Sequence, residues 1–129
     1  MTDPISDMIA SLKNALRIKK RELIIPYSKI KENIAKILHR EGFLKDCKKI
    51  KKRKKQYLIL YLKYNRDLPA ISEIKRISRP GRRFYIDQKE ISKFSKGFGF
   101  LIISTSKGVM TDKNAKKAGV GGELICRIW

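Results

Sequence analysis

Three hydroxyl residues in succession, Ser104, Thr105 and Ser106, are followed by Lys107 and come directly after the apolar run 101–103. Short hydroxyl side chains can exchange hydrogen bonds with base edges, ribose hydroxyls or phosphate oxygens, and a lysine adds a positive charge. The same residue types also suit a solvated turn. The pattern therefore favours either a contact with a polynucleotide or an ordinary turn, and chemistry alone leaves both open.

A second basic segment combines arginines with aromatic rings. Arg79, Arg82 and Arg83 surround a Pro-Gly pair, so three guanidinium groups meet at a tight turn, and Phe84 and Tyr85 follow. Guanidinium groups bind phosphates, and a ring can stack an unpaired base. Because side chains alternate along a strand, we expect one of the two rings to face outward and the other to lie in the core.

Catalysis and metal binding have little support in the sequence. The single histidine, His39, stands beside Arg40 and Glu41 on an expected helix, and we interpret it as a surface residue. The two cysteines, Cys47 and Cys126, form no Cys-x-x-Cys pair, and we expect both to be reduced and packed. We see no obvious pair of acids and no metal-ligand cluster, so we expect no catalytic residue, no metal and no cofactor.

Two glycine-rich stretches differ from nucleotide-binding loops. The stretch 97–101 lacks the third glycine of a dinucleotide loop and runs into a strand, and 119–123 lacks the Lys-Ser/Thr ending of a P-loop. We interpret both as turns in which glycine lets the backbone closely approach another strand or, alternatively, a ligand.

The composition is strongly basic. Among 129 residues, 32 are Lys or Arg and 12 are Asp or Glu, which gives a formal net charge of +20. Such a charge attracts polyanions. Charged residues make up 34% and hydrophobic ones 42% of the chain, and no apolar run approaches the ~18 residues of a membrane span. These values exclude disorder throughout and a large multidomain enzyme, and we expect no membrane partner.

Helix signals organise the first part of the chain. Asp3 and Pro4 favour a helix start, and apolar residues recur at helical spacing to about Arg17. Ser28 can cap a second helix, which Gly42 ends. These signals predict two helices with one apolar face each.

Strand signals occupy the segments around and after the second helix. We expect a strand at 23–25 and a hairpin formed by 43–50 and 57–62. Seven of the eight residues from 48 to 55 are basic, so the hairpin tip is either a solvated surface or a phosphate contact.

The second half of the chain favours short strands. We expect them at 71–77, 83–86, 100–104 and 123–129. A helix from Thr111 or Asp112 to Ala118, closed by Gly119, interrupts them. The predicted fold class is therefore α+β, with an N-terminal α/β lobe (1–64) packed against a mainly β C-terminal lobe (65–129).

Several motifs, in this order, resemble one known family. They are Thr2-Asp3-Pro4-Ile5 with Asp7-Met8, Ile25-Pro26-Tyr27-Ser28-Lys29, Ile74-Lys75-Arg76-Ile77-Ser78-Arg79-Pro80-Gly81, 103–112 and 119–129. Together they cover nearly the whole chain. The sequence resembles the eighth protein of the small ribosomal subunit in its bacterial type, and the last two motifs are the most specific.

The resemblance implies a structural rRNA-binding protein without catalytic activity. Such a protein binds the central domain of small-subunit rRNA early in assembly, next to neighbouring ribosomal proteins such as the fifth and seventeenth. The family also implies repression of its own operon through a similar mRNA site. A bacterial cytoplasm or a plastid stroma would both suit such a chain.

The resemblance also implies which residues contact RNA. In this family the hydroxyl loop enters a distorted RNA helix, supported by a Gly-Glu pair, while the N-terminal lobe holds the RNA backbone. The expected RNA-binding residues, with the arginine segment included, are Thr2, Pro4, Lys29, Arg79, Arg82, Arg83, Tyr85, Ser104, Thr105, Ser106, Lys107, Gly122 and Glu123.

Two questions stay open at this point. Glu123, an acid among phosphates, is expected either to accept from a base amino group, to orient Ser104 or Ser106, or to pair with Arg127 along its strand. Two other classes of protein also fit the charge: a non-specific nucleic-acid binder of nucleoid or chaperone type, and a small nucleic-acid-processing enzyme.

Overall fold

The computed structural model describes residues 3–95, 97 and 99–129. Two compact units make up the chain. The N-terminal unit is Pro4–Ser72, and the C-terminal unit is Glu73–Trp129 together with Asp3. This division follows Ser72, whereas the sequence-based boundary after Tyr64 stays a prediction about the lobes.

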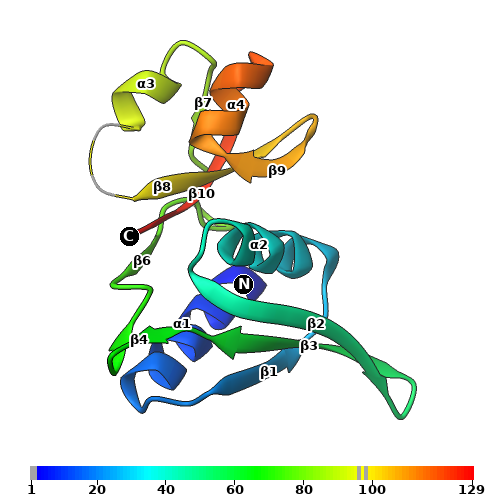
Figure 1. Cartoon of the computed structure of the whole chain (residues 1–129). Coiled ribbons are helices and arrows are strands. Elements are labelled where there is room, and N and C mark those ends of the chain that lie inside the picture. The colour runs from blue at the N-terminus through cyan, green and yellow to red at the C-terminus, as the bar shows by residue number, and fades with distance from the viewer. Residues whose placement is uncertain (1–2, 96, 98) are drawn as a thin grey trace. The chain divides into compact units, whose positions relative to one another are not determined.

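The N-terminal unit contains two helices and five strands (Figure 1). They are α1 (Pro4–Arg17), β1 (Glu22–Pro26), α2 (Lys29–Arg40), β2 (Leu44–Lys52), β3 (Lys55–Leu62), β4 (Tyr64–Asn65) and β5 (Leu68–Pro69). Strands β1, β3 and β2 form an antiparallel sheet in that order, and β4 pairs with β5. Alternate residues of β3, namely Leu58, Leu60 and Leu62, are buried, as expected for a strand with one face on a core.

The helix ends in this unit follow the sequence signals. The hydroxyl of Ser28 accepts a hydrogen bond from the Lys31 amide, which is an N-cap. Gly42 has a φ of 84°, a backbone conformation that glycine adopts without strain, and the chain turns there into β2. The predicted strand at 23–25 and the basic hairpin are confirmed as β1 and β2–β3.

The C-terminal unit is built around one sheet. Its elements are β6 (Ile74–Arg76), β7 (Tyr85–Ile86), α3 (Ile91–Phe94), β8 (Phe100–Thr105), β9 (Gly108–Thr111), α4 (Asp112–Ala118) and β10 (Gly122–Ile128). The sheet order is β6-β10-β8-β9, and β7 pairs with the start of β10. A core of buried residues holds the helices on this sheet: Ile86, Ile91, Leu101, Ile103, Ala115 and Leu124.

The predicted α+β class is confirmed, with differences in detail. Helix α4 begins after an N-cap at Thr111 and ends at Gly119, whose φ of 69° is left-handed. The segments β4–β5, α3 and β9 were not predicted, because they are short and their pairing partners or packing surfaces define them. The strand expected at 83–86 is shorter, since only β7 is paired.

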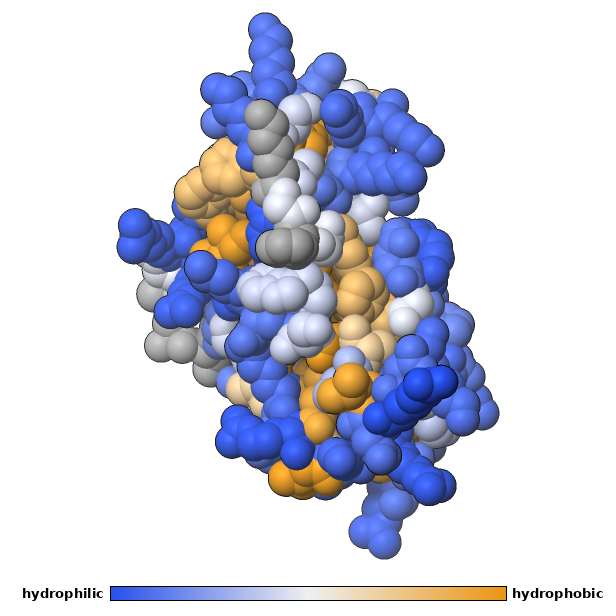
Figure 2. Space-filling model, turned by 60° about the vertical axis from the view of Figure 1, so that its left-hand side comes forward, coloured by the Kyte–Doolittle hydropathy of each residue, from blue (hydrophilic) through white to orange (hydrophobic). Residues whose placement is uncertain are grey.

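The surface agrees with the charged composition. Hydrophilic side chains cover most of the face seen in Figure 2, with smaller hydrophobic areas between them. Among the residues that the structure describes, no helix is long and apolar enough to cross a membrane.

Candidate nucleic-acid interface

The hydroxyl segment lies at the tip of a hairpin. Strand β8 ends at Thr105 and β9 begins at Gly108, its paired residue, so Ser106 and Lys107 form a two-residue turn. The Thr105 hydroxyl donates to the Gly108 carbonyl at 2.8 Å and accepts from the Lys107 amide at 3.1 Å. Thr105 therefore uses its hydroxyl to hold the turn together.

The two serines differ from Thr105. Within the described part of the chain, the hydroxyls of Ser104 and Ser106 have no hydrogen-bond partner, and Ser106 and Lys107 are exposed. Of the two interpretations of this segment, the turn is present. This turn leaves the hydroxyls of Ser104 and Ser106 and the ammonium group of Lys107 able to bind a ligand.

Strand pairing brings further predicted residues to this hairpin. Glu123 on β10 lies opposite Tyr85 on β7 and opposite Ser104 on β8. Directly paired residues of an antiparallel sheet point to the same face, so these three side chains form one row across three strands. Tyr85 is 68% exposed, which leaves its ring free to stack.

Glycines make this close pairing possible. A Cβ at Gly122 would come within 2.1 Å of the Ser104 carbonyl oxygen, and one at Gly121 within 2.3 Å of the Ile86 carbonyl oxygen. A Cβ at Gly99 would lie 1.7 Å from the Ile128 oxygen. The interpretation of these stretches as close approaches between strands is confirmed.

The carboxylate of Glu123 has partners other than those expected. It accepts from the Ser78 hydroxyl at 2.5 Å and from the Arg83 guanidinium at 2.9 Å. Burial acts to raise the pKa of Glu123, but these two hydrogen bonds and the charge of Arg83 outweigh it, so the pKa is lowered. Glu123 is therefore held ionised.

This geometry corrects two of the expectations for Glu123. Among the described residues, neither Ser104 nor Ser106 is a partner of its carboxylate, and the expected pairing with Arg127 is wrong. The Arg127 side chain instead donates to the Phe94 carbonyl. A β-bulge between Leu124 and Cys126 shifts the register of β10, so Glu123 pairs with Ser104 whereas Arg127 pairs with Leu101, on the opposite face of β8.

Ser78 is a residue that the sequence reasoning missed. It is fully buried, its hydroxyl also accepts from the Phe84 amide at 3.0 Å, and its own amide donates to the Leu124 carbonyl. One side chain thus joins both ends of the arginine segment to β10. The only sequence signal was its position at the start of that segment.

The arginines divide into two kinds. Arg79 and Arg82 pair through their backbones at 3.1 and 2.9 Å, and both residues are exposed to solvent. Arg83 is half exposed and bound to Glu123. Arg79 and Arg82 are therefore available for phosphates, whereas Arg83 helps to position Glu123.

The expectation for the two rings is only partly correct. Phe84 is 40% exposed and Tyr85 is 68% exposed, so neither is core. Phe84 rests edge-on against Phe94, with the ring centres 5.4 Å apart. The Phe84 carbonyl accepts from the Leu124 amide of β10, and its ring packs on Phe94 at the edge of the core instead of inside it.

The remaining predicted residues belong mainly to the N-terminal unit. Thr2 lies outside the described residues. Pro4 is the exposed first residue of α1, and Lys29 is the exposed first residue of α2. Lys29 contacts the Glu32 carboxylate at 3.3 Å, and the Tyr27 hydroxyl donates to the same oxygen at 3.1 Å.

Glu32 parallels Glu123 in its electrostatics. Burial acts to raise the pKa of Glu32, but the hydrogen bonds from Lys29 and Tyr27, with the charge of Lys36, lower it overall. Lys29 therefore stands at a helix N-terminus beside an ionised acid.

The residues considered for other chemistry are structural. His39 is exposed, with Nδ1 3.2 Å from the Leu44 carbonyl oxygen. Cys47 and Cys126 are free thiols, and burial raises the pKa of Cys126 to about 12. Among the described residues, no group of three or more His, Cys, Asp or Glu side chains could hold a metal ion.

Comparison with known proteins gives one family. The sequence matches the model of ribosomal protein S8 over residues 3–129. A relative from Dictyoglomus thermophilum is 47% identical over 129 residues, covering 100% of this chain and 98% of the relative. A relative from Thermus aquaticus is 47% identical over 137 residues, with 100% and 99% covered. One from Geotalea uraniireducens is 48% identical over 130 residues, with 100% and 98% covered.

All three relatives bear the name small ribosomal subunit protein uS8. Proteins of this kind are structural parts of the ribosome, so the expectation of a protein without enzymatic activity is confirmed. The family model spans nearly the whole chain, and identities near one half extend over at least 98% of each relative. This chain therefore belongs to the ribosomal protein S8 family.

Proposed function

We propose that this chain binds the central domain of small-subunit rRNA directly and helps that domain to assemble. The observation that carries the proposal is the β8–β9 hairpin, in which Thr105 holds the turn while Ser104 and Ser106 keep their hydroxyls available. Membership of the S8 family supports a role in the small subunit.

The chemistry suits a distorted RNA helix. The major groove of A-form RNA is too deep and narrow for side chains, so sequence is read where bases are unpaired or splayed out. Ser104 and Ser106 would bind base edges or ribose hydroxyls there, and Tyr85 would stack an exposed base. Gly122 and Glu123 support the contact, because Gly122 admits the close strand pairing and Glu123 lies in the same row.

Cations would fix the register of the RNA. Lys107 is exposed at the hairpin tip, and Arg79 and Arg82 are exposed on the arginine segment, so all three can bind phosphates without reading sequence. Arg83 would contribute through its contact with Glu123. The family resemblance assigns Thr2, Pro4 and Lys29 to the backbone of the same RNA, and the exposure of Pro4 and Lys29 supports this.

Partners beyond rRNA follow from the same family. We propose contacts with neighbouring small-subunit proteins, the fifth and seventeenth among them, and repression of its own operon through an mRNA that imitates the rRNA site. Because the relatives are bacterial, the ribosome concerned is that of a bacterial cytoplasm.

The test separates a binding hydroxyl from a structural one. Ser106→Ala removes an available hydroxyl, and we expect it to weaken binding to a central-domain rRNA fragment by about 1–3 kcal/mol with unchanged thermal stability. Thr105→Val removes the hydroxyl that holds the turn, so it should lower both stability and binding. Both variants would be titrated against the rRNA fragment and against tRNA.

Competitor RNA decides between selective and non-selective binding. We expect Ser106→Ala to bind tRNA as well as the unaltered protein does. Equal losses on both RNAs would contradict the proposal. Duplex DNA bound as tightly as the rRNA fragment would favour the non-specific binder instead.

A further inference from the structure

The three-stranded sheet of the N-terminal unit has one face without a helix packed on it. Strand register gives three rows on this outer face. The rows are Glu22, Tyr61 and Asp46; Ile24, Ile59 and Lys48; Pro26, Tyr57 and Ile50. The opposite face carries Ile25, Leu58 and Leu60, all buried.

The outer face is open and partly apolar. Ile24, at its centre, is 54% exposed, while its neighbours in sequence point to the core. Two tyrosines of β3, Tyr57 and Tyr61, flank the row that contains Ile24. Four residues of a strand span about 13 Å, so the rings stand roughly two nucleotides apart along an extended RNA strand.

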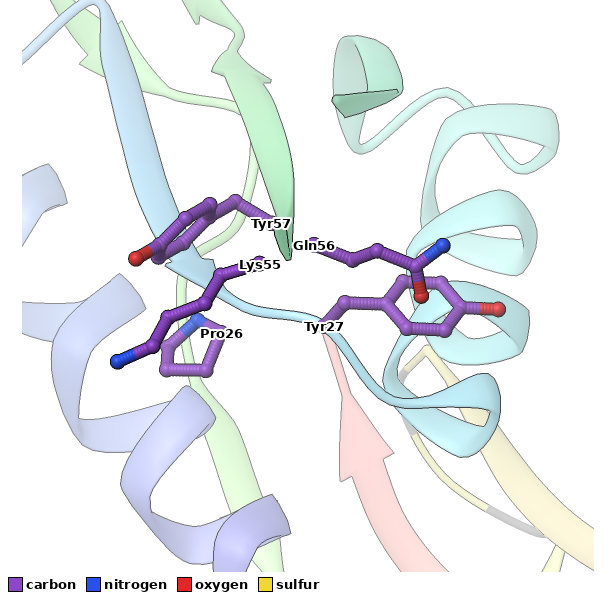
Figure 3. Close-up of a pocket in the computed structure, with 5 residues that line it drawn as sticks. All are labelled: Pro26, Tyr27, Lys55, Gln56 and Tyr57. Carbon is purple, nitrogen blue, oxygen red and sulfur yellow. The ribbon is translucent and has the colours of Figure 1, made fainter. Parts of the chain in front are cut away.

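The Tyr57 ring borders a surface hollow of about 370 Å³. In Figure 3, Tyr57, Pro26 and Lys55 extend to one side of the backbone, and Gln56 and Tyr27 extend to the other. Tyr57 and Pro26 are also directly paired across the two strands. A flat ring, a proline and a terminal ammonium group thus stand together on the outer face.

The Tyr61 ring borders a second hollow, of about 610 Å³, at the other end of the same face. Three cations line it, namely Arg21, Lys45 and Lys63, against one acid, Glu22. The ammonium group of Lys48 also lies 5.8 Å from the centre of the Tyr61 ring. Both tyrosines therefore have cations nearby, and around Tyr61 the four cations Arg21, Lys45, Lys48 and Lys63 outnumber the two acids paired with it, Glu22 and Asp46.

The sheet register divides the lysine-rich hairpin between two faces. Lys52 pairs with Lys55 and shares the outer face with Tyr57, whereas Lys51 pairs with Gln56 on the opposite face. The ammonium group of Lys49 lies over the Tyr27 ring at 4.3 Å, also away from the outer face. The outer face thus has its own lysines, at the end next to Tyr57.

We propose that this outer face binds a single-stranded RNA segment, with Tyr57 and Tyr61 stacking bases and the lysines at both ends holding phosphates. Stacking on a ring with a cation nearby is the usual way in which proteins hold unpaired nucleotides without reading their sequence. The surrounding charge favours a polyanion, and two hollows each joining a tyrosine to cations favour a nucleotide strand over a protein surface. This site is separate from the β8–β9 hairpin and does not depend on the function proposed for it.

The test uses a twelve-residue oligouridine, which has no secondary structure, and the full-length protein. Tyr57→Leu and Tyr61→Leu keep an apolar side chain but remove the ring. Each should weaken oligouridine binding about tenfold at low salt, as expected when one base no longer stacks. Tyr57→Phe keeps the ring and should bind as the unaltered protein does.

A pair of neighbouring lysines provides the charge control. Lys52→Gln and Lys51→Gln remove the same charge from opposite faces of one strand. We expect Lys52→Gln to weaken binding at least twice as much as Lys51→Gln. Equal effects would mean that the hairpin acts only through its total charge, and the proposal would then be wrong.

Direct mapping keeps the proposal testable if a variant fails to fold. Ultraviolet crosslinking of the unaltered protein to the oligouridine should modify Tyr57 or Tyr61, as read by mass spectrometry. Crosslinks confined to the C-terminal unit would contradict the proposal. Tyr57→Leu and Tyr61→Leu should keep the preference of the protein for the central-domain rRNA fragment over tRNA, so a failure of the rRNA hairpin and a failure of this site give different results.

Discussion

The two hairpins, β2–β3 and β8–β9, have the same length of turn and opposite chemistry. Each joins its strands by two residues, Arg53-Lys54 in the first and Ser106-Lys107 in the second. The first is surrounded by lysines, whereas the second carries hydroxyls. Charge is concentrated on one, and the hydrogen-bonding groups proposed to select RNA stand on the other.

Their backbones differ in the way that the turn is made. Arg53 and Lys54 both have positive φ, 50° and 66°. Such φ values suit the twist of a hairpin but strain the backbone of residues other than glycine and asparagine. In β8–β9 the positive φ falls on Gly108, at 111°, and Thr105 adds two side-chain hydrogen bonds. Lysines that attract phosphates need only be exposed to solvent. Hydroxyls that select an RNA site must be held at fixed positions.

The largest difference between the two hairpins should appear when Gly122 is substituted. In Gly122→Ala the new methyl group would overlap the Ser104 carbonyl, so β10 and β8 must separate. We expect the free energy of unfolding to fall by about 3 kcal/mol and selective rRNA binding to be lost. Urea denaturation and rRNA titration measure both. Arg53→Ala, at the other tip, is the control and should change stability by less than about 1 kcal/mol. Unchanged stability of Gly122→Ala would show that the hairpin tolerates a wider spacing.

An intermediate effect is expected at Glu123. Glu123→Gln keeps the shape but removes the charge that binds Ser78 and Arg83. We expect a loss of about 1–2 kcal/mol at pH 7, because Arg83 is half exposed and solvent weakens its share.

The effect of Glu123→Gln should also depend on pH. The folded-state pKa of Glu123 is lowered from 4.5, so its stabilisation is present above that value and is lost as pH falls through the folded pKa. The unaltered protein and the variant should therefore converge in acid. Urea denaturation at pH 7 and pH 3 measures the difference between them, and a difference that stays constant would contradict this assignment.

The smallest effect on selectivity is expected at the basic hairpin. Neutralising Lys52, Arg53, Lys54 and Lys55 with Gln should flatten the salt dependence of rRNA binding, by a slope of about 0.7–0.9 for each phosphate that the variant no longer neutralises. The ratio of rRNA to tRNA affinity should hardly change, because phosphates carry no sequence. Titrations between low and moderate salt measure both quantities. A changed ratio would show that the lysine-rich hairpin also selects RNA.

Local signals predicted much of the fold. Ser28, Thr111 and Gly119 act at the helix ends where the sequence predicted them, because a cap depends on residues within one turn. The basic hairpin was also predicted, from two strand-like segments that enclose a run of basic residues. Elements such as α3 and β9 were missed, since four-residue segments carry too little periodicity to be recognised.

The candidate site was predicted as a set of residues but not as an arrangement. The order Ser104-Thr105-Ser106 does not predict which of the three hydroxyls forms hydrogen bonds within the turn. In the structure it is the hydroxyl of Thr105. Ser78 was missed because a serine acquires a buried role only through its neighbours. Tyr85 and Glu123 were each predicted as site residues. Only strand pairing shows that they form one row with Ser104.

The sequence by itself determined the charge, the helix ends, the fold class and the family, because these depend on composition and on patterns of near neighbours. Tertiary structure decided which groups are free to bind. Residues 78, 83, 104 and 123 lie on four segments, and sheet register sets their contacts. A hydroxyl or a carboxylate is available only if no closer partner satisfies it. The partners of Glu123 come from a distant part of the chain, whereas those of Thr105 lie within its own turn.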